Sequence, residues 1–419
     1  MMEQTSPLMR NLRRSGVWFV ASVLALAASS IGLSRFLETE TPTVSLALDP
    51  LNVNALIGEI TNDLNDASNA PDLDAMLARI ESALRFDLAD ARLYSLIGEI
   101  KYRKGEEDRA YEFFDQARKL SKTEIHALQR SIGRSIETGD LSGAVGEIDI
   151  LLRRWPNQFP AIAEGLPTIL SNPDGYQAVL AAIRAAAPWR ADLLVALGKT
   201  PAGLDLANRL LLDLTGSSAP PNPNEVSAVI KGYIGQKEYE RAYRLFLFSL
   251  SDQERKLGGY IFNSTFEPVR SGKPFDWQVH DQPGLEIAFS ASDDSVEGEG
   301  GATVRFLNTP VKHAALSQYI ELPPGSYKIS LLASARNLKL PKELFWSIWC
   351  VGADSETTRF NIPEGTYNRQ ALGQEFSVGA AGCPMQLLKL ETAAIAESWR
   401  FRYVGTLVMH KLSIERLSS

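Results

Sequence analysis

The sequence predicts a multidomain chain in which an all-α helical-repeat array precedes an all-β antiparallel sandwich, with one N-terminal transmembrane helix or signal segment ahead of both. Three observations predict this order. An uncharged apolar run lies near the N-terminus, a 34-residue period follows it, and short alternating runs begin after residue 259. The length of 419 residues fits two or three domains, each large enough to bury a core.

The overall composition excludes several classes of protein. Hydrophobic residues make up 45% of the chain and charged residues 22%, as in ordinary globular domains. The formal net charge of -7 disfavours a nucleic-acid partner, because phosphate binding needs a basic footprint. With only two cysteines and four histidines, we expect no metal and no cofactor.

The N-terminal segment has the charge pattern of a membrane anchor. Arg10, Arg13 and Arg14 precede the apolar run of residues 16–33, and acidic residues follow it, which indicates a cytoplasmic N-terminus and an exported remainder. We expect residues 1–36 to be a cytoplasmic tail and signal anchor and 37–50 a polar linker. The chain would then be a single-pass protein of a bacterial inner membrane with its bulk in the periplasm. A secretory signal cleaved after Ala25-Leu26-Ala27 is the alternative.

Residues 51–250 show helical periodicity and an internal repeat. Small and apolar residues of one unit recur 34 positions later, where Gly139 matches Gly105 and Ala144 matches Ala110, and Pro156 closes the second unit. Prolines between residues 159 and 216 predict shorter helices and a degenerate repeat there.

This pattern resembles the tetratricopeptide repeat family, whose unit is a pair of antiparallel helices. The resemblance implies that small residues lie where the two helices approach closely and that Phe114 fills the gap between units. The packing positions are Tyr94, Gly98, Gly105, Ala110, Phe114, Ala117, Gly139, Ala144 and Pro156. Repeat arrays present concave surfaces that hold other proteins, although a plain spacer between membrane and C-terminal domain would have the same pattern.

Residues 251–419 have a different sequence pattern from the helical array before them. About eight short alternating runs, separated by turn residues such as Pro323-Pro324-Gly325, predict an antiparallel β-sandwich. The order of Asn263, Phe266-Glu267 and Trp277 at its start, with the later strand-like runs, resembles galactose-binding-like, jelly-roll carbohydrate-binding modules. That resemblance implies a glycan as a ligand of this domain.

Four tryptophans of the predicted sandwich are candidates for stacking on sugar rings. They are Trp277, Trp346, Trp349 and Trp399. Strand alternation places Trp346 and Cys350 on one face and Trp349 on the other. We therefore expect Trp346 in the core, and Trp277 and Trp349 are the possible glycan contacts.

The two cysteines, Cys350 and Cys383, lie in or beside strand-like segments. In an exported chain they predict one disulfide that staples the sandwich, whereas in the cytosol they would be two buried thiols.

The sequence lacks the short motifs of common hydrolases and of metal-dependent or redox enzymes, so we expect no catalysis. The arrangement of domains resembles proteins associated with bacterial exopolysaccharide synthesis and export. That resemblance implies a non-catalytic periplasmic scaffold or adaptor, whose array binds protein partners of a synthesis or export complex and whose sandwich can touch glycan. A protein whose β domain does the recognition is the first alternative, and a glycan-active enzyme is the second.

Overall fold

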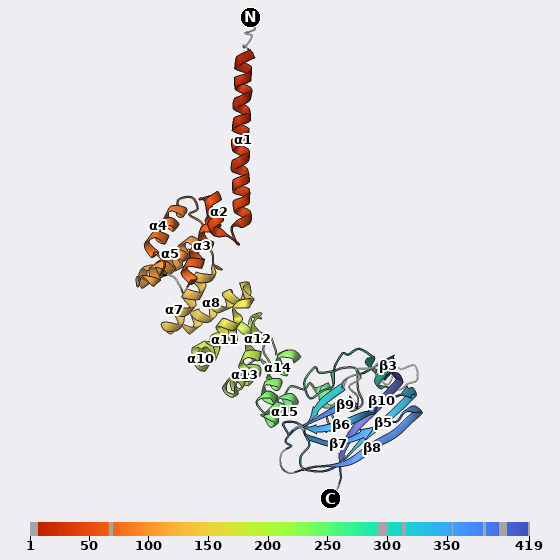
Figure 1. Cartoon of the computed structure of the whole chain (residues 1–419). Helices are drawn as coiled ribbons and strands as arrows, with labels where there is room; N and C mark the ends of the chain where they lie inside the picture. Colours follow the sequence, from red (N-terminus) through yellow and green to blue (C-terminus); the bar gives the residue numbers. More distant parts are fainter. Residues whose placement is uncertain are drawn as a thin grey trace. The chain divides into compact units, whose positions relative to one another are not determined.

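The computed structural model describes residues 7–66, 70–290, 300–311, 316–353, 355–379, 383–393 and 400–417, with side chains from Val17 onward. Within these residues, sixteen α-helices precede ten β-strands, which confirms the predicted fold class (Figure 1). The chain divides into two compact units. The first is Met1–Ile162 with Asn172–Ala182, and the second is Ala163–Ser171 with Ile183–Ser419.

The first helix, α1 (Pro7–Leu37), contains the predicted apolar run. Its stretch Val17–Leu37 has a mean hydropathy of 1.9 and, among the described helices, is the one long and apolar enough to cross a membrane. Its side chains face outward, as at Trp18, which is 73% exposed. Length and composition fit a membrane anchor and a signal sequence alike.

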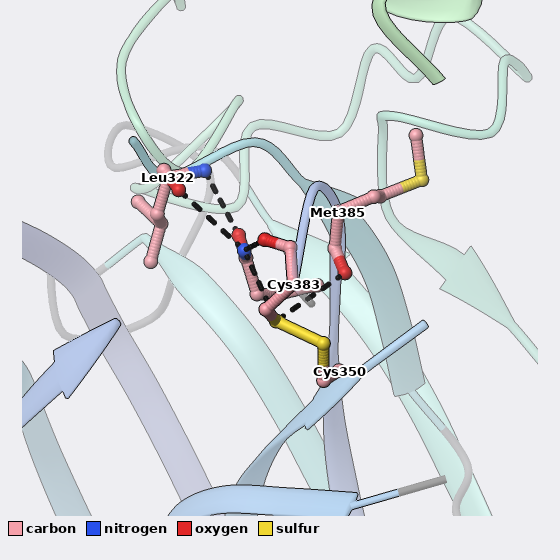
Figure 2. Close-up of a disulfide and its surroundings, with 5 residues drawn as sticks. Leu322, Cys350, Cys383 and Met385 are labelled. Carbon is pink, nitrogen blue, oxygen red and sulfur yellow. Dashed lines mark hydrogen bonds between the residues drawn. A yellow bond between two sulfur atoms is a disulfide. The ribbon is translucent and has the colours of Figure 1, made fainter. Parts of the chain in front are cut away.

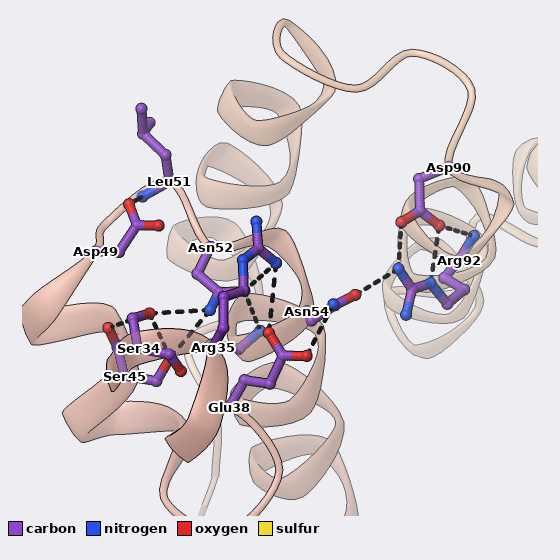
Figure 3. Close-up of polar contacts among 11 residues, drawn as sticks. Ser34, Arg35, Glu38, Ser45, Asp49, Leu51, Asn52, Asn54, Asp90 and Arg92 are labelled. Atoms are coloured by element: carbon purple, nitrogen blue, oxygen red, sulfur yellow. Dashed lines mark hydrogen bonds and ion pairs between the residues drawn. The ribbon is translucent and has the colours of Figure 1, made fainter. Parts of the chain in front are cut away.

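The segment expected as a polar linker instead contains a short helix, α2 (Pro42–Leu48). Proline at its start supplies a helical φ angle and needs no donor there. The side chains of Ser34, Ser45 and Asn52 are fully buried together (Figure 3). The hydroxyls of Ser34 and Ser45 lie 2.8 Å apart, and Asn52 Nδ2 donates to Ser34 Oγ at 2.9 Å. This network satisfies the buried polar groups and ties α2 to α1.

Six helices joined in consecutive pairs follow in the first unit. They are α3 (Val53–Asn65), α4 (Leu73–Leu84), α5 (Ala91–Arg103), α6 (Glu107–Leu120), α7 (Ile125–Glu137) and α8 (Leu141–Arg154). Gly105 and Gly139 adopt positive φ angles of 79° and 80° in the three-residue connections of the last two pairs. That conformation favours glycine, which accounts for its recurrence 34 residues apart.

The expected packing positions lie as follows. Ala110, Phe114, Ala117 and Ala144 are at most 1% exposed. Tyr94 is half-buried and its hydroxyl donates to the Leu88 carbonyl at 3.2 Å. Pro156 begins a 3₁₀ turn, η1 (Pro156–Gln158), directly after α8. The helix pairs form, and membership of the tetratricopeptide family stays a prediction.

Gly98 lies where α5 meets α6. A Cβ atom there would lie 2.7 Å from Cε1 of Phe114 and 3.0 Å from the Ala110 carbonyl oxygen. Gly133 on α7 has no heavy atom within 4 Å of the same position. A methyl group added at Gly98 would therefore overlap its neighbours, whereas one added at Gly133 would have free space around it.

We expect Gly98→Ala to destabilise the first unit by about 1–3 kcal/mol, because the new methyl overlaps Phe114 and the Ala110 backbone. Gly133→Ala should stabilise it by up to about 1 kcal/mol through helix propensity. Urea unfolding of the two variants measures both changes. A stabilised Gly98→Ala would contradict the close contact between α5 and α6.

Within the proline-containing stretch three helices have only five to eight residues, as predicted, but the helix from Pro201 to Leu214 has 14. Eight described α-helices follow α8. They are α9 (Phe159–Ala163), α10 (Leu166–Ser171), α11 (Pro173–Arg184), α12 (Arg190–Leu197), α13 (Pro201–Leu214), α14 (Pro223–Gly235), α15 (Tyr239–Phe248) and α16 (Asp252–Arg255). Prolines begin α11, α13 and α14, where a missing backbone donor costs nothing. In the second unit Arg190 is 9% exposed and pairs with Glu225, which also caps α14.

The β-sandwich consists of two five-stranded sheets. One has the order β1-β4-β9-β6-β7 and the other β2-β3-β10-β5-β8, and all described pairs are antiparallel. The strands are β1 (Gln278–Val279), β2 (Leu285–Ser290), β3 (Gly301–Thr309), β4 (Leu316–Ile320), β5 (Gly325–Lys339), β6 (Leu344–Cys350), β7 (Ser355–Asn361), β8 (Gly365–Val378), β9 (Gln386–Thr392) and β10 (Tyr403–Arg416). Alternate residues of both sheets form one buried core between them.

The last helix pair packs on the sandwich through aromatic side chains. The ring of Phe246 on α15 lies 5.1 Å from Phe262 and 5.2 Å from Phe275, between centroids. Such contacts bury large apolar surfaces. The end of the array therefore packs on the segment that leads into the sandwich through a cluster of aromatic rings.

The predicted disulfide is confirmed. Cys350 at the end of β6 is bonded to Cys383, with Cα atoms 5.3 Å apart (Figure 2). Beside it the buried Gln386 side chain accepts from the Leu322 backbone N–H at 2.8 Å and donates to the Cys383 carbonyl at 2.9 Å. The bridge and this amide join the start of β9 to its neighbours.

Candidate functional site

A cavity of about 560 Å³, lined by both polar and apolar groups, opens on the outer face of the second sheet, over β5, β8 and β10. Side chains that point away from the core line it. They are Ser334, Arg336, Thr366, Asn368, Thr406 and Val408, together with Ala335 and Tyr367. A cavity of this size suits a small ligand. Its hydroxyl and amide groups can donate and accept hydrogen bonds, and its guanidinium group can donate them.

Two irregularities in the strands shape this cavity. The register of β10 against β5 shifts between Val404 and Thr406, where Gly405 has a φ angle of 102° and Asn337 on β5 has one of 50°. A Cβ on Gly405 would lie 2.4 Å from the Asn337 carbonyl oxygen. Such bulges re-aim neighbouring side chains, which here are Arg336 and Thr406.

Ser334 lies at the centre of the hydrogen bonds at this site. Its Oγ donates to Asn368 Oδ1 at 2.9 Å and accepts from the backbone N–H of Arg369 at 2.9 Å. His410 Nε2 lies 2.9 Å from the same Oγ, and its Nδ1 lies 3.2 Å from the Gly300 carbonyl. These contacts fix the Ser334 and Asn368 side chains before any ligand arrives.

Tyr367 contributes an aromatic ring at the edge of the cavity. Burial raises the pKa of its hydroxyl to about 12, so the group stays neutral at physiological pH. The hydroxyl donates to the Pro363 carbonyl at 3.3 Å, and the ring packs against the core. The described residues of the cavity therefore provide polar groups for hydrogen bonds to a ligand and one half-buried tyrosine ring.

Trp277 is not at the surface, which corrects its expected role in glycan contact. It is 1% exposed, its ring stacks on Phe266 at 4.9 Å, and its Nε1 donates to the Asn263 carbonyl at 2.8 Å. Trp346 is fully buried, as expected from strand alternation. Trp399 lies outside the described residues.

Trp349 lies on the outer face of the other sheet and is half-buried. Its Nε1 donates to Ser347 Oγ and to Glu391 Oε2, both at 3.0 Å. The Lys389 ammonium lies 4.7 Å from the ring centroid and covers one face of the indole. A sugar cannot stack on that face unless Lys389 moves.

Hydrogen bonds stabilise the ionised form of the Glu391 carboxylate, which lies next to Trp349. Burial alone would raise the pKa of Glu391, but hydrogen bonds from Ser347, Lys389 and Trp349 hold this pKa below its ordinary value. The carboxylate therefore stays ionised at neutral pH and keeps both Lys389 and the indole in place.

A second, smaller cavity of about 350 Å³ lies in the first unit between α3, α5 and α7. Burial would raise the pKa of Glu99, but hydrogen bonds from Arg103 and Arg130 hold it below its ordinary value. Ser95 also lines the cavity, is 1% exposed and has no hydrogen-bond partner for its Oγ in the described part of the chain. A buried hydroxyl without a partner is costly and suits a site that receives a polar ligand.

The comparisons with known proteins give structural likenesses. No family model matches the chain, and no curated protein matches it. A CBM4 structure is 13% identical with a TM-score of 0.27, over 38% of this chain and 99% of that one. TmCBM61 in complex with β-1,4-galactotriose is 14% identical with a TM-score of 0.24, over 37% and 92%. The carbohydrate-binding module CBM6cm-2 from Cellvibrio mixtus lichenase 5A, in complex with cellotriose, is 13% identical with a TM-score of 0.22, over 33% and 92%.

Sequence reasoning missed the residues of the larger cavity. The first half of β8, with Thr366 and Asn368, has neither alternation nor β-branched enrichment, so the sequence gives no strand signal there. The signal that could have indicated a site is the polar outer face of β5, where serines and basic residues alternate with apolar residues.

Proposed function

We propose that this protein is a glycan-binding protein whose β-sandwich recognises saccharide in the cavity over β5, β8 and β10. The single observation that carries the proposal is the cavity itself, with hydrogen-bonding side chains held in place by Ser334 and His410. Sugar hydroxyls both donate and accept hydrogen bonds, and the lining offers both kinds of partner. The sequence resemblance to carbohydrate-binding modules supports the same ligand class.

In this proposal the apolar stretch of α1 is a membrane anchor, and the rest of the chain lies in the periplasm. Its length of 21 residues is enough to cross the hydrocarbon of a bilayer. The disulfide supports an oxidising compartment. The ligand would then be an envelope polysaccharide or exopolysaccharide.

We further propose that binding is not followed by hydrolysis. Glycoside hydrolysis uses two carboxylates on either side of the scissile bond. The residues described around the cavity are serine, alanine, arginine, threonine, tyrosine, asparagine and valine. Incubation with a bound oligosaccharide should therefore leave its chain length unchanged by mass spectrometry, and shortened products would contradict this.

Calorimetric titration of the full chain in detergent against neutral and acidic bacterial oligosaccharides tests the proposal. We expect saturable binding to at least one of them, and about 3- to 10-fold weaker binding for Asn368→Ala, because one hydrogen bond of about 1 kcal/mol is lost. Asn361→Ala is the matched control, since Asn361 is an exposed asparagine on β7 of the other sheet. The absence of binding to any oligosaccharide would contradict the proposed function. An equal loss of affinity in both variants would contradict the proposed position of the binding site.

A second candidate function, a scaffold for protein partners, is favoured by the cavity between α3, α5 and α7. Ser95, which is buried and has no hydrogen-bond partner among the described residues, and the charged group of Glu99, Arg103 and Arg130 suit an extended peptide. Such partners would belong to a polysaccharide synthesis or export complex. Crosslinking in cells from a photoreactive residue at Gln129, which also lines this cavity, should capture such a partner, whereas the same residue at exposed Ile136 should not.

A further inference from the structure

The short helix α2 runs back alongside α1 toward its N-terminal end. Ser34 Oγ donates to the Ser45 carbonyl at 3.0 Å, and Ser30 Oγ donates to the Leu48 carbonyl at 2.8 Å. Because Ser30 lies one turn before Ser34 while Leu48 follows Ser45, the two helices are antiparallel. At 1.5 Å per residue, Leu48 therefore lies about 10 Å back from the end of α1 at Leu37.

Exposed apolar side chains gather around this level of α1. Leu51, in the turn after α2, is 60% exposed, and Phe86, in the loop after α4, is 66% exposed. Both line one cavity of about 270 Å³, so the turn and the loop lie side by side. Val44 on α2 and Leu88 in the same loop are 47% and 68% exposed. These four residues, Val44, Leu51, Phe86 and Leu88, are called the apolar rim below.

The hydrogen bonds also limit how much of α1 can lie in hydrocarbon. A span that ended at Leu37 would place Ser34 and its hydrogen-bonded partners Ser45 and Asn52 about 5 Å inside the hydrocarbon, and the Asp49 carboxylate about 10 Å inside it. A charge there is costly, since no water solvates it. The hydrocarbon therefore ends before Ser34, so that the apolar run of residues 16–33 crosses it and the turn after α2 lies at its edge.

We infer that the apolar rim inserts into the interfacial layer of the bilayer that α1 crosses, on the side of its C-terminal end. This inference rests on the proposed membrane anchor. Insertion of Leu51 and Phe86 removes apolar surface from water. The buried network between α1, α2 and α3 holds Leu51, the neighbour of Asn52, at the membrane level, and Phe86 lines the same cavity as Leu51. The first helices of the array are then fixed on the membrane and do not swing on a linker.

Site-directed spin labelling of the full chain in phospholipid nanodiscs tests this inference. The chain's two cysteines are bonded to each other, so single cysteines can be introduced and labelled. Labels at Leu51→Cys and Phe86→Cys should be several-fold more accessible to oxygen than to a water-soluble nickel chelate. Ile136→Cys on α7, a position that is 41% exposed, is the control and should show the opposite order.

A label at Leu26→Cys, a 71% exposed position on α1, separates the inference from its premise. If Leu26 and Phe86 are both accessible to the chelate, α1 is not a membrane anchor. If Leu26 is protected by lipid while Leu51 and Phe86 behave like Ile136, the inference is overturned and the anchor stands. The comparison of nanodiscs that hold one or two copies of the chain tests a second explanation. If the apolar rim is protected only in nanodiscs with two copies, the rim contacts a second copy of the chain, and the inference of membrane insertion is overturned.

Discussion

Replacing Trp277 by alanine should lower the free energy of unfolding of the sandwich by about 3–5 kcal/mol. The side chain is 1% exposed, stacks on Phe266 and lies 5.8 Å from Trp346, between ring centroids. Its removal leaves a large cavity in the shared core of the two sheets and removes one of the two donors to the Asn263 carbonyl, which keeps only the Phe266 backbone N–H. Denaturant unfolding followed by near-ultraviolet circular dichroism measures this loss.

Trp349→Ala is the matched control for Trp277. This half-buried ring lies on the outer face of its sheet, so its loss should cost about 1–2 kcal/mol. Both variants should retain glycan binding under conditions in which they are folded. Equal destabilisation would contradict the buried position of Trp277, and a folded Trp277→Ala chain that no longer binds glycan would restore that residue as a contact.

Reduction of the Cys350–Cys383 disulfide should have the second largest effect, a loss of about 3–4 kcal/mol. The bridge spans 33 residues of sequence, and opening it restores the entropy of that loop to the unfolded chain. The chain should therefore unfold at a lower denaturant concentration in dithiothreitol than in its absence.

The double variant Cys350→Ala, Cys383→Ala controls for side effects of the reductant. It should unfold at the lower midpoint with or without dithiothreitol, since it has no bridge to open. The prediction fails if reduction leaves the midpoint of the native chain unchanged. It also fails if the double variant remains sensitive to the reductant.

Much of the fold was accessible from sequence because its signals are local. Gly105 and Gly139 lie at helix ends that require positive φ angles, and the buried Phe114 and Ile148 follow them at the same offset. Alternation in β6 placed Trp346 inside and Trp349 outside. The cysteine pair was predictable because the chain offers only one pairing.

The candidate site was not accessible because it depends on strand pairing and local irregularity. Ser334, Asn368 and Thr406 come from three strands far apart in sequence, and only the sheet order brings them together. The bulge at Gly405 shifts the register in a way that alternation does not reveal. The helix α2 was missed because its stability comes from the buried Ser45 contact with α1, not from its short sequence.

Hydrogen exchange of the full chain, with and without the oligosaccharide that binds most tightly, tests the central claim most directly. We expect slower exchange in the segments that line the cavity, which are residues 334–336, 366–368 and 406–408, and no change in β6 and β7. Protection confined to α3, α5 and α7, or to the strands around Trp349, would contradict glycan recognition by the cavity over β5, β8 and β10.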